Sequence, residues 1–214
     1  MATGPADPRP RPIPRPLLAA LLCAALVFVG AGAFLAFDLR DGPRGVARSW
    51  LGSAIGGPFD LVDQNGKRVS DADLRGTWLL VYFGYTHCPD ACPAALNNIA
   101  LAFRELGATR RAAIRAVFIT IDPARDTPDV MKDYVASFDA PILALTGTAG
   151  QVAQAAKAYR VYYAQRAEPG GNYSLDHTSV IYVIDPKGRF AASLGSEVTP
   201  AQIAERLKQL LGQD

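Results

Sequence analysis

The sequence lacks the features that mark nucleotide-dependent and nucleic-acid-binding proteins. Its 214 residues carry a formal net charge of only +2, and the charged residues are spread along the chain. It has no glycine-rich loop of the G-x-x-x-x-G-K type, so no backbone cradle for phosphates is predicted. We therefore expect neither nucleotide chemistry nor a nucleic-acid partner. With 50% hydrophobic residues and no internal repeat, the composition is typical of one folded domain plus an additional segment.

Cysteine and histidine are also scarce, with three and two residues respectively. Cys23 lies inside a long apolar run, where we expect it to face lipid or to serve in packing. A closed zinc site needs four ligands, and His87 would have to be the fourth after Cys88, Cys92 and His177. Neighbouring side chains generally point in different directions, so His87 is not expected to bind an ion beside Cys88. This scarcity argues against a structural zinc site.

The N-terminal region reads as a membrane anchor. Residues 1–16 are rich in proline and carry Arg9, Arg11 and Arg15, which predicts a disordered tail on the cytoplasmic side. Residues 17–37 are all apolar and long enough to form a single transmembrane helix, and 38–54 read as a linker. A cleaved signal peptide is the alternative. Both interpretations place the domain at 55–214 in the periplasm or an equivalent compartment beyond the inner membrane, where disulfides persist.

The segment 55–214 alternates between strand and helix patterns. A hairpin is predicted at 59–69, turning at Asn65-Gly66. Further strands are predicted at 78–85, 114–121, 142–145, 161–164, 179–184 and 189–194, and helices at 93–106, 128–138, 149–159 and 200–211. This order indicates a three-layer α/β domain.

Cys88 and Cys92 follow the most hydrophobic predicted strand, on the loop that leads into a helix. The turn-forming pair Pro89-Asp90 should fold this loop, and Pro93 disfavours helical geometry at Cys92, so we expect the two sulfurs to face one another. Such a pair can form a disulfide, bind a thiophilic metal or exchange electrons with another thiol pair. A structural disulfide would gain little, because the loop that it closes is short.

Other polar residues are predicted at the same sheet edge. Asp122 follows the next parallel strand, and His177 reaches this edge if the strand after it is antiparallel, as the hairpin turn at 186–188 suggests. Two thiolates and one imidazole make a soft ligand set suited to copper. We expect Asp122, His87 and Asp176 to surround the ligands without binding the ion, with Asp176 and Thr178 orienting the ring of His177.

Three motifs together resemble the Sco/SenC family of copper chaperones, which assist assembly of the binuclear copper centre of cytochrome c oxidase. They are GYTHCPDACP at 84–93, DPARDTP at 122–128 and DHTS at 176–179, and the resemblance runs over 55–212. It implies a thioredoxin-like fold behind one membrane helix, with Cys88, Cys92 and His177 binding Cu(I) or Cu(II) and Asp122 near the site. The implied partners are the copper-accepting oxidase subunit, an upstream copper donor and a thiol reductant. Ala91, where relatives often carry a bulkier apolar residue, is a small departure.

The leading hypothesis is thus a membrane-anchored metallochaperone, not an enzyme. The alternative is a thiol-disulfide oxidoreductase that uses Cys88 and Cys92 as a redox pair. Thioredoxin-like oxidoreductases usually have Cys-x-x-Cys and a proline facing it, whereas this chain has three intervening residues and no proline between 170 and 185. A third hypothesis, a tethered interaction module, would make both cysteines dispensable.

Overall fold

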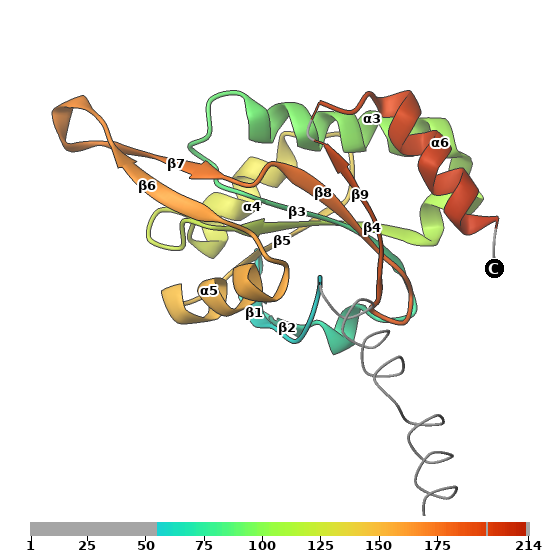
Figure 1. Ribbon diagram of the computed structural model, residues 1–214, viewed down its shortest axis with the longest axis horizontal. Helices are drawn as coiled ribbons and strands as arrows, with labels where there is room; N and C mark the ends of the chain where they lie inside the picture. Colours follow the sequence, from blue (N-terminus) through green and yellow to red (C-terminus); the bar gives the residue numbers. More distant parts are fainter. Residues whose placement is uncertain (1–54, 196, 213–214) are drawn as a thin grey trace, which may run out of the picture. The chain divides into compact units, whose positions relative to one another are not determined.

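A seven-stranded mixed sheet forms the centre of the molecule (Figure 1). The computed structural model describes residues 55–195 and 197–212; the expected tail, membrane helix and linker, with Cys23, lie outside these residues. The strands are β1 (Asp60–Asp63), β2 (Arg68–Ser70), β3 (Trp78–Gly84), β4 (Ile114–Thr120), β5 (Ile142–Thr146), β8 (Val180–Ile184) and β9 (Phe190–Gly195). Their order in the sheet is β2-β1-β5-β4-β3-β8-β9.

The middle of the sheet is parallel and apolar. β3 is buried at every position and pairs in parallel with β4 from Trp78↔Ile114 to Gly84↔Thr120. On its other side β3 pairs with β8 in antiparallel fashion, with Tyr82 opposite Ile181. The predicted antiparallel strand after His177 is therefore confirmed. The start of β8 and the ends of β3 and β4 consequently meet at one edge of the sheet.

The predicted hairpin near the start of the domain is confirmed. β1 and β2 pair in antiparallel fashion, and Gly66 in the turn between them has a φ of 80°, which favours glycine. The Asp63 carboxylate accepts hydrogen bonds from the backbone N–H groups of Asn65 and Lys67. These bonds explain why a short polar sequence turns here. A single 3-10 turn, η1 (Ala72–Leu74), then leads into β3.

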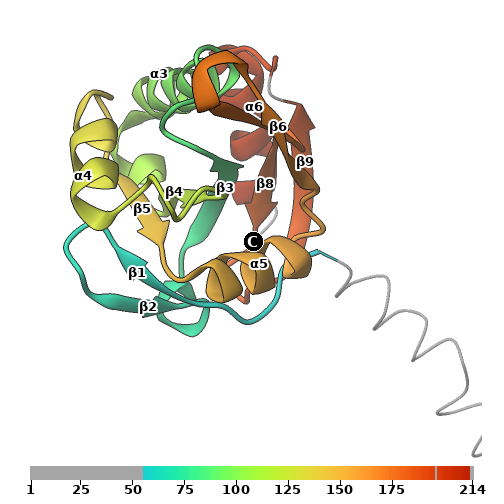
Figure 2. The ribbon, with the colours of Figure 1, turned by 90° about the vertical axis from the view of Figure 1, so that its left-hand side faces the viewer.

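Helices cover both faces of the sheet, which confirms the three layers. Figure 2 shows α3 (Ala91–Ala112), α4 (Pro128–Ala136) and α6 (Pro200–Leu211) on one face and α5 (Ala149–Ala158) on the other. The rings of Phe118 and Tyr134 pack 5.5 Å apart under α4, and those of Phe83 and Tyr159 pack 5.2 Å apart under the end of α5. Side chains alternate between the two faces along β3 and β4, so these strands contribute to the apolar core on each face of the sheet.

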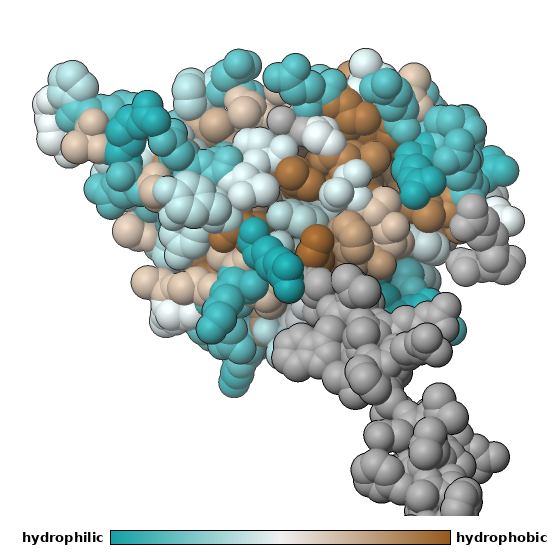
Figure 3. All heavy atoms as spheres, in the orientation of Figure 1, coloured by the Kyte–Doolittle hydropathy of each residue, from teal (hydrophilic) through white to brown (hydrophobic). Residues whose placement is uncertain are grey.

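A two-stranded ribbon projects from the sheet (Figure 1). It consists of β6 (Tyr163–Ala167) and β7 (Tyr173–His177), joined through the 3-10 turn η2 (Pro169–Gly171), and Tyr163 pairs with His177. Its outer part carries mostly hydrophilic side chains, as the left side of Figure 3 shows. The strand predicted at 161–164 is shifted to 163–167, and β7 was not predicted. Both errors arise because the ribbon is held by backbone pairing between polar segments, which leave no apolar pattern in the sequence.

The helix after the cysteines also differs from its predicted bounds. α3 begins at Ala91, so Cys92 lies in its first turn and not on the preceding loop. The first N–H groups of a helix have no intrahelical acceptor, so Pro93 costs no hydrogen bond there, and this outweighs its effect on the preceding residue. Gly107, with a φ of 74°, kinks the helix where the sequence predicted its end. Within 55–195 and 197–212, no helix has the length and apolar character to span a membrane.

Candidate metal centre

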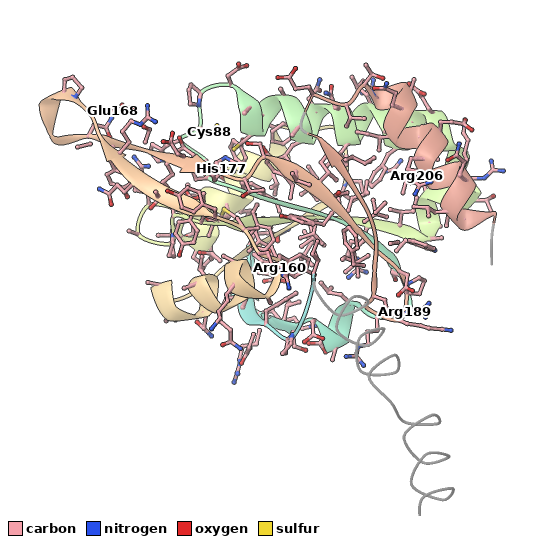
Figure 4. All side chains as sticks on the ribbon, in the orientation of Figure 1. Cys88, Arg160, Glu168, His177, Arg189 and Arg206 are labelled. Atoms are coloured by element: carbon pink, nitrogen blue, oxygen red, sulfur yellow. The ribbon has the colours of Figure 1, made fainter. Side chains whose placement is uncertain are left out.

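Two thiols and one imidazole converge at the edge of the sheet where β3 ends and β8 begins. Among the described residues, the ligand atoms of Cys88, Cys92 and His177 all lie within 4.8 Å of one another. The Sγ of Cys92 lies 3.6 Å from Nε2 of His177, although 85 residues separate them. Figure 4 shows Cys88 and His177 close together at the base of the projecting ribbon. The structure therefore brings together the three residues that the sequence proposed as ligands.

The two cysteines occupy different environments. Cys88 lies in the turn after β3, is half-buried, and donates its backbone N–H to the Tyr85 carbonyl at 3.2 Å. Cys92 is fully buried in the first turn of α3, and its backbone N–H donates to the Cys88 sulfur at 3.4 Å. The Cys92 sulfur lies over Gly84, where an added Cβ would be 2.7 Å from Sγ. The site therefore has one sulfur near the surface and one beneath it.

Cys88 and Cys92 form no disulfide. The hydrogen bond from Cys92 lowers the pKa of Cys88 to about 4, with smaller contributions from His177 and backbone N–H groups, against the opposing effect of burial. The pKa of Cys92 is raised, because its proton is held in the bond to Cys88 and because its sulfur is buried. Cys88 is accordingly the thiolate of the metal-free pair.

His177 is oriented by its backbone neighbour and by two tyrosine rings. Its Nδ1 lies 3.1 Å from the Thr178 carbonyl oxygen, which can only accept a hydrogen bond, so Nδ1 carries the proton. Nε2, which carries the lone pair of the neutral ring, faces Cys92. The rings of Tyr82 and Tyr85 pack edge-on to the imidazole, with centroids 6.2 and 6.0 Å away. These contacts present a nitrogen lone pair to the sulfurs, as a metal-binding histidine requires.

A buried carboxylate braces the cysteine turn, and the sequence interpretation missed it. Asp126 accepts hydrogen bonds from the backbone N–H of Thr86 at 3.1 Å and from its hydroxyl at 2.6 Å. It also accepts one from the Thr120 hydroxyl at 2.5 Å, and its backbone carbonyl accepts one from Thr146. Asp126 thus joins the ends of β3, β4 and β5. The available signal was its place in the motif at 122–128, which also holds Asp122.

Asp122 connects the sheet edge to the ribbon and does not face the sulfurs directly. Its carboxylate accepts hydrogen bonds from Nε of Arg125 at 2.5 Å and from the hydroxyl of Tyr173 at 2.9 Å. The Arg125 guanidinium stacks over the Tyr173 ring at 3.7 Å and donates to the Tyr173 carbonyl oxygen. Because Tyr173 begins the strand that ends at His177, Asp122 holds the element that carries the imidazole.

His87 and Asp176 lie outside the three-residue cluster. The exposed His87 ring has its Nδ1 3.1 Å from the Thr86 hydroxyl, whose own proton goes to Asp126. The Asp176 carboxylate forms an ion pair with Arg166 on the exposed side of the ribbon. It is the Thr178 carbonyl that contacts the ring of His177. The expected orienting role of Asp176 is therefore filled by backbone.

The donor set fits a soft metal ion. Bonds of about 2.0 Å to nitrogen and about 2.3 Å to sulfur allow a nitrogen and a sulfur on one ion to lie up to about 4.3 Å apart. The 3.6 Å separation of the Cys92 sulfur and the His177 nitrogen satisfies this limit. Thiolates select copper, zinc and iron-sulfur clusters. The cluster as described offers three ligands, fewer than a closed zinc site takes.

The family model described as SCO1/SenC matches residues 48–212. The yeast mitochondrial protein SCO2, from Saccharomyces cerevisiae, is 39% identical over 164 residues, which cover 76% of this chain and 54% of the yeast protein. The chain spans about half the length of the first curated relatives that it matches.

Solved structures show the same fold. Bradyrhizobium japonicum ScoI, solved with copper bound, superposes with a TM-score of 0.68 at 44% identity, covering 72% of this chain and 98% of ScoI. BsSco is described as having a disulfide switch and as a member of the Sco family of cytochrome c oxidase assembly proteins. It superposes with a TM-score of 0.58 at 25% identity, over 75% of this chain and 95% of BsSco. The thioredoxin-like α/β fold implied by the motifs is thereby confirmed. On the family model, the sequence identity and the shared fold, this chain belongs to the SCO1/SenC family.

Proposed function

We propose that the chain is a copper chaperone that binds one copper ion through Cys88, Cys92 and His177 and assists assembly of the binuclear copper centre of cytochrome c oxidase. The observation that carries this proposal is the convergence of two sulfurs and an imidazole nitrogen within 4.8 Å. Its support comes from a relative of 44% identity that was solved with copper bound. Copper, as Cu(I) or Cu(II), is the cargo, and the copper-accepting oxidase subunit is the partner.

The geometry of the cysteines suits delivery. A chaperone must hold its ion and also release it to the thiolates of a partner. Cys92 is fully buried, whereas Cys88 is half-buried in a turn, so a partner's sulfur can approach the ion from the side of Cys88. With three ligands, the ion can accept a ligand from the partner before it loses one of its own. An upstream copper donor would load the site by the reverse exchange.

The described chain enters the domain far from the copper site. Gly56 lies near Gly188, in the turn that follows β8, and β8 runs from His177 toward that turn. The entry point is therefore at the opposite end of the sheet from the copper site; Figure 4 shows Arg189 of this turn far from Cys88. We propose that a cytoplasmic tail at 1–16, an inner-membrane helix at 17–37 and a linker at 38–54 precede this point.

The polar residues around the site are assigned supporting roles. Asp122 positions His177 indirectly, through Arg125 and Tyr173. His87 and Asp176 are hydrogen-bonded elsewhere and leave the ligand set at three.

The test of the ligand set is a matched pair of histidine variants. His177→Ala removes the only imidazole that faces the sulfurs and should weaken copper binding by orders of magnitude. His87→Ala removes an exposed ring next to Cys88 and should leave copper binding nearly unchanged. Competition with a copper chelator measures both affinities, and circular dichroism checks that both variants fold. Equal copper affinities for His177→Ala and the native protein would contradict the proposed ligand set.

A thiol-disulfide oxidoreductase is the second candidate, and the low pKa of Cys88 favours it. In this reaction the Cys88 thiolate attacks a disulfide of the partner, forms a mixed disulfide and releases one partner thiolate. Cys92 then loses its proton, attacks the Cys88 sulfur and releases the second partner thiolate. The partner has gained two electrons, and a Cys88–Cys92 disulfide remains. The disulfide switch described for BsSco shows that a relative's cysteines undergo redox change. If metal-free His177→Ala reduces the partner as fast as the native protein, and the copper-loaded native protein transfers no copper, this second function replaces the first.

A further inference from the structure

Tyr82 lies directly beneath the proposed copper site, in the middle of β3. Its side chain is fully buried and points to the same face of the sheet as Gly84, over which the Cys92 sulfur lies. The ring stacks on Phe118 with centroids 6.5 Å apart, and it meets the His177 ring edge-on. These contacts fix the ring. Its hydroxyl group cannot move far without disturbing the sheet.

The Tyr82 hydroxyl has no hydrogen-bond partner among residues 55–195 and 197–212. A buried donor without a partner destabilises a protein, so its retention calls for a second state in which it is satisfied. The Cys92 sulfur lies at the edge of the Tyr82 ring, since a Cβ built on Gly84 would be 2.7 Å from that sulfur and 3.2 Å from Cε1 of the ring. The Ser179 hydroxyl, which donates to the His177 carbonyl oxygen, belongs to the same site. A tyrosine hydroxyl can donate one hydrogen bond.

We propose that the Tyr82 hydroxyl donates a hydrogen bond to the Cys92 sulfur when copper is bound, and that Tyr82 is a positioning residue that tunes the copper centre. The inference rests on the proposed copper site. A thiol sulfur is a weak acceptor. A cysteine that binds a metal ion does so as a thiolate, which is a strong acceptor for a buried O–H group.

Such a bond has consequences that a packing role lacks. A hydrogen bond to a metal-bound thiolate withdraws electron density from the sulfur, and hydrogen bonding around cysteine sulfur tunes the redox potential of copper sites. It should raise the energy of the sulfur-to-Cu(II) charge-transfer band. It should also favour Cu(I) over Cu(II), and so raise the reduction potential of the bound ion. The loaded protein gains stability from this bond, whereas the metal-free protein gains none.

The experiment compares Tyr82→Phe with Tyr134→Phe in the full-length chain. Tyr134 is a matched control because its hydroxyl is also buried without a partner among the described residues. Its ring packs on Phe118, as that of Tyr82 does. Each variant is loaded with Cu(II) and followed by absorption, by the Cu(II)/Cu(I) potential and by competition with a chelator. The thermal unfolding midpoint is measured with and without copper.

Tyr82→Phe should move the charge-transfer band to lower energy, lower the reduction potential and weaken copper binding about tenfold. Without copper, its unfolding midpoint should stay the same or rise. Tyr134→Phe should change neither band nor potential.

The inference is overturned if Tyr82→Phe leaves the band and the potential unchanged, or if Tyr134→Phe shifts them equally. It is also overturned if Ser179→Ala reproduces the shift, since Ser179 would then be the hydroxyl's partner. If the native protein binds no copper through Cys88, Cys92 and His177, the proposed function itself is wrong. If it binds copper but Tyr82→Phe changes nothing, only the inference about Tyr82 is wrong.

Discussion

At the scale of the residue, the site depends on Gly84, because a residue with a side chain would not fit at this position. Gly84 ends β3 directly beneath the Cys92 sulfur, and a Cβ there would lie 2.7 Å from Sγ and 3.0 Å from the Phe118 ring. Both neighbours are fixed, because Cys92 is in a helix and Phe118 is fully buried in β4. Glycine is therefore needed at this position because there is no room for a Cβ. The backbone of Gly84 has ordinary strand geometry, which any residue could adopt.

Gly84→Ala should consequently displace the Cys92 sulfur. We expect copper affinity to fall by at least tenfold, and the free energy of unfolding to fall by about 1–3 kcal/mol from overpacking. Gly195→Ala is the matched control, because Gly195 lies in strand β9 and an added Cβ meets nothing within 4 Å. Chelator competition and denaturant unfolding measure the two effects. If Gly84→Ala binds copper with native affinity, the position of the Cys92 sulfur does not depend on the missing Cβ of Gly84.

The two thiols should also differ in their pH dependence. Because the pKa of Cys88 is lowered to about 4, its thiolate is fully formed above about pH 5, whereas an ordinary cysteine titrates near pH 8.5. In the reduced metal-free protein, alkylation of Cys88 by iodoacetamide should change little between pH 5.5 and 8, and the buried Cys92 should react slowly. Peptide mass spectrometry assigns the modified residue.

Cys92→Ala provides the control for that measurement. It removes the hydrogen bond that contributes most to lowering the pKa of Cys88, so the alkylation rate should then rise with pH across the same range. A native rate that already rises about tenfold per pH unit would contradict the lowered pKa of Cys88.

At the scale of the element, the ends of three strands are connected by one buried residue, Asp126. Asp126 receives hydrogen bonds from Thr86 after β3 and from Thr120 at the end of β4, and its carbonyl receives one from Thr146 at the end of β5. Burial raises the pKa of Asp126, against the opposing effect of these donors. The cysteine turn is thus held by an acceptor that touches neither sulfur.

Asp126→Asn should loosen this turn, because an amide nitrogen cannot accept the hydrogen bonds that the second carboxylate oxygen accepts. We expect a loss of about 1–3 kcal/mol in the free energy of unfolding, together with weaker copper binding. Asp129→Asn, at an exposed position in the first turn of α4, is the control. Denaturant unfolding with the two variants side by side measures the difference. Equal, small losses would mean that Asp126 does not brace the turn.

Some of the elements were predictable from the sequence and others were not. The apolar runs of β3, β4 and β8 and the cap residues Thr127, Thr148 and Thr199 mark their elements locally, so these were predicted well. In the ribbon, the strand predicted at 161–164 is shifted to 163–167 and β7 is not predicted, because polar segments paired by backbone hydrogen bonds carry no such pattern. The sequence predicts Cys92 on the loop because proline disfavours helical geometry in the preceding residue, but a helix N-terminus tolerates this arrangement.

At the scale of the whole molecule, distant segments meet through topology. His177 reaches Cys92 across 85 residues because β8 is antiparallel to β3, which the turn at 186–188 made predictable. The contacts of Asp126 and of Tyr82 were not predictable, since they depend on side-chain positions at the ends of several strands. The same topology places the copper site and the entry of the chain at opposite ends of the sheet.

Titration of the reduced full-length protein with copper tests the central claim most directly. Absorption and electron spin resonance report both the amount of bound copper and its thiolate ligation. We predict one copper ion per chain, a sulfur-to-Cu(II) charge-transfer band, and the loss of both in the Cys88→Ser, Cys92→Ser double variant. Copper uptake that is absent from the native protein, or that survives unchanged in the double variant, would contradict it.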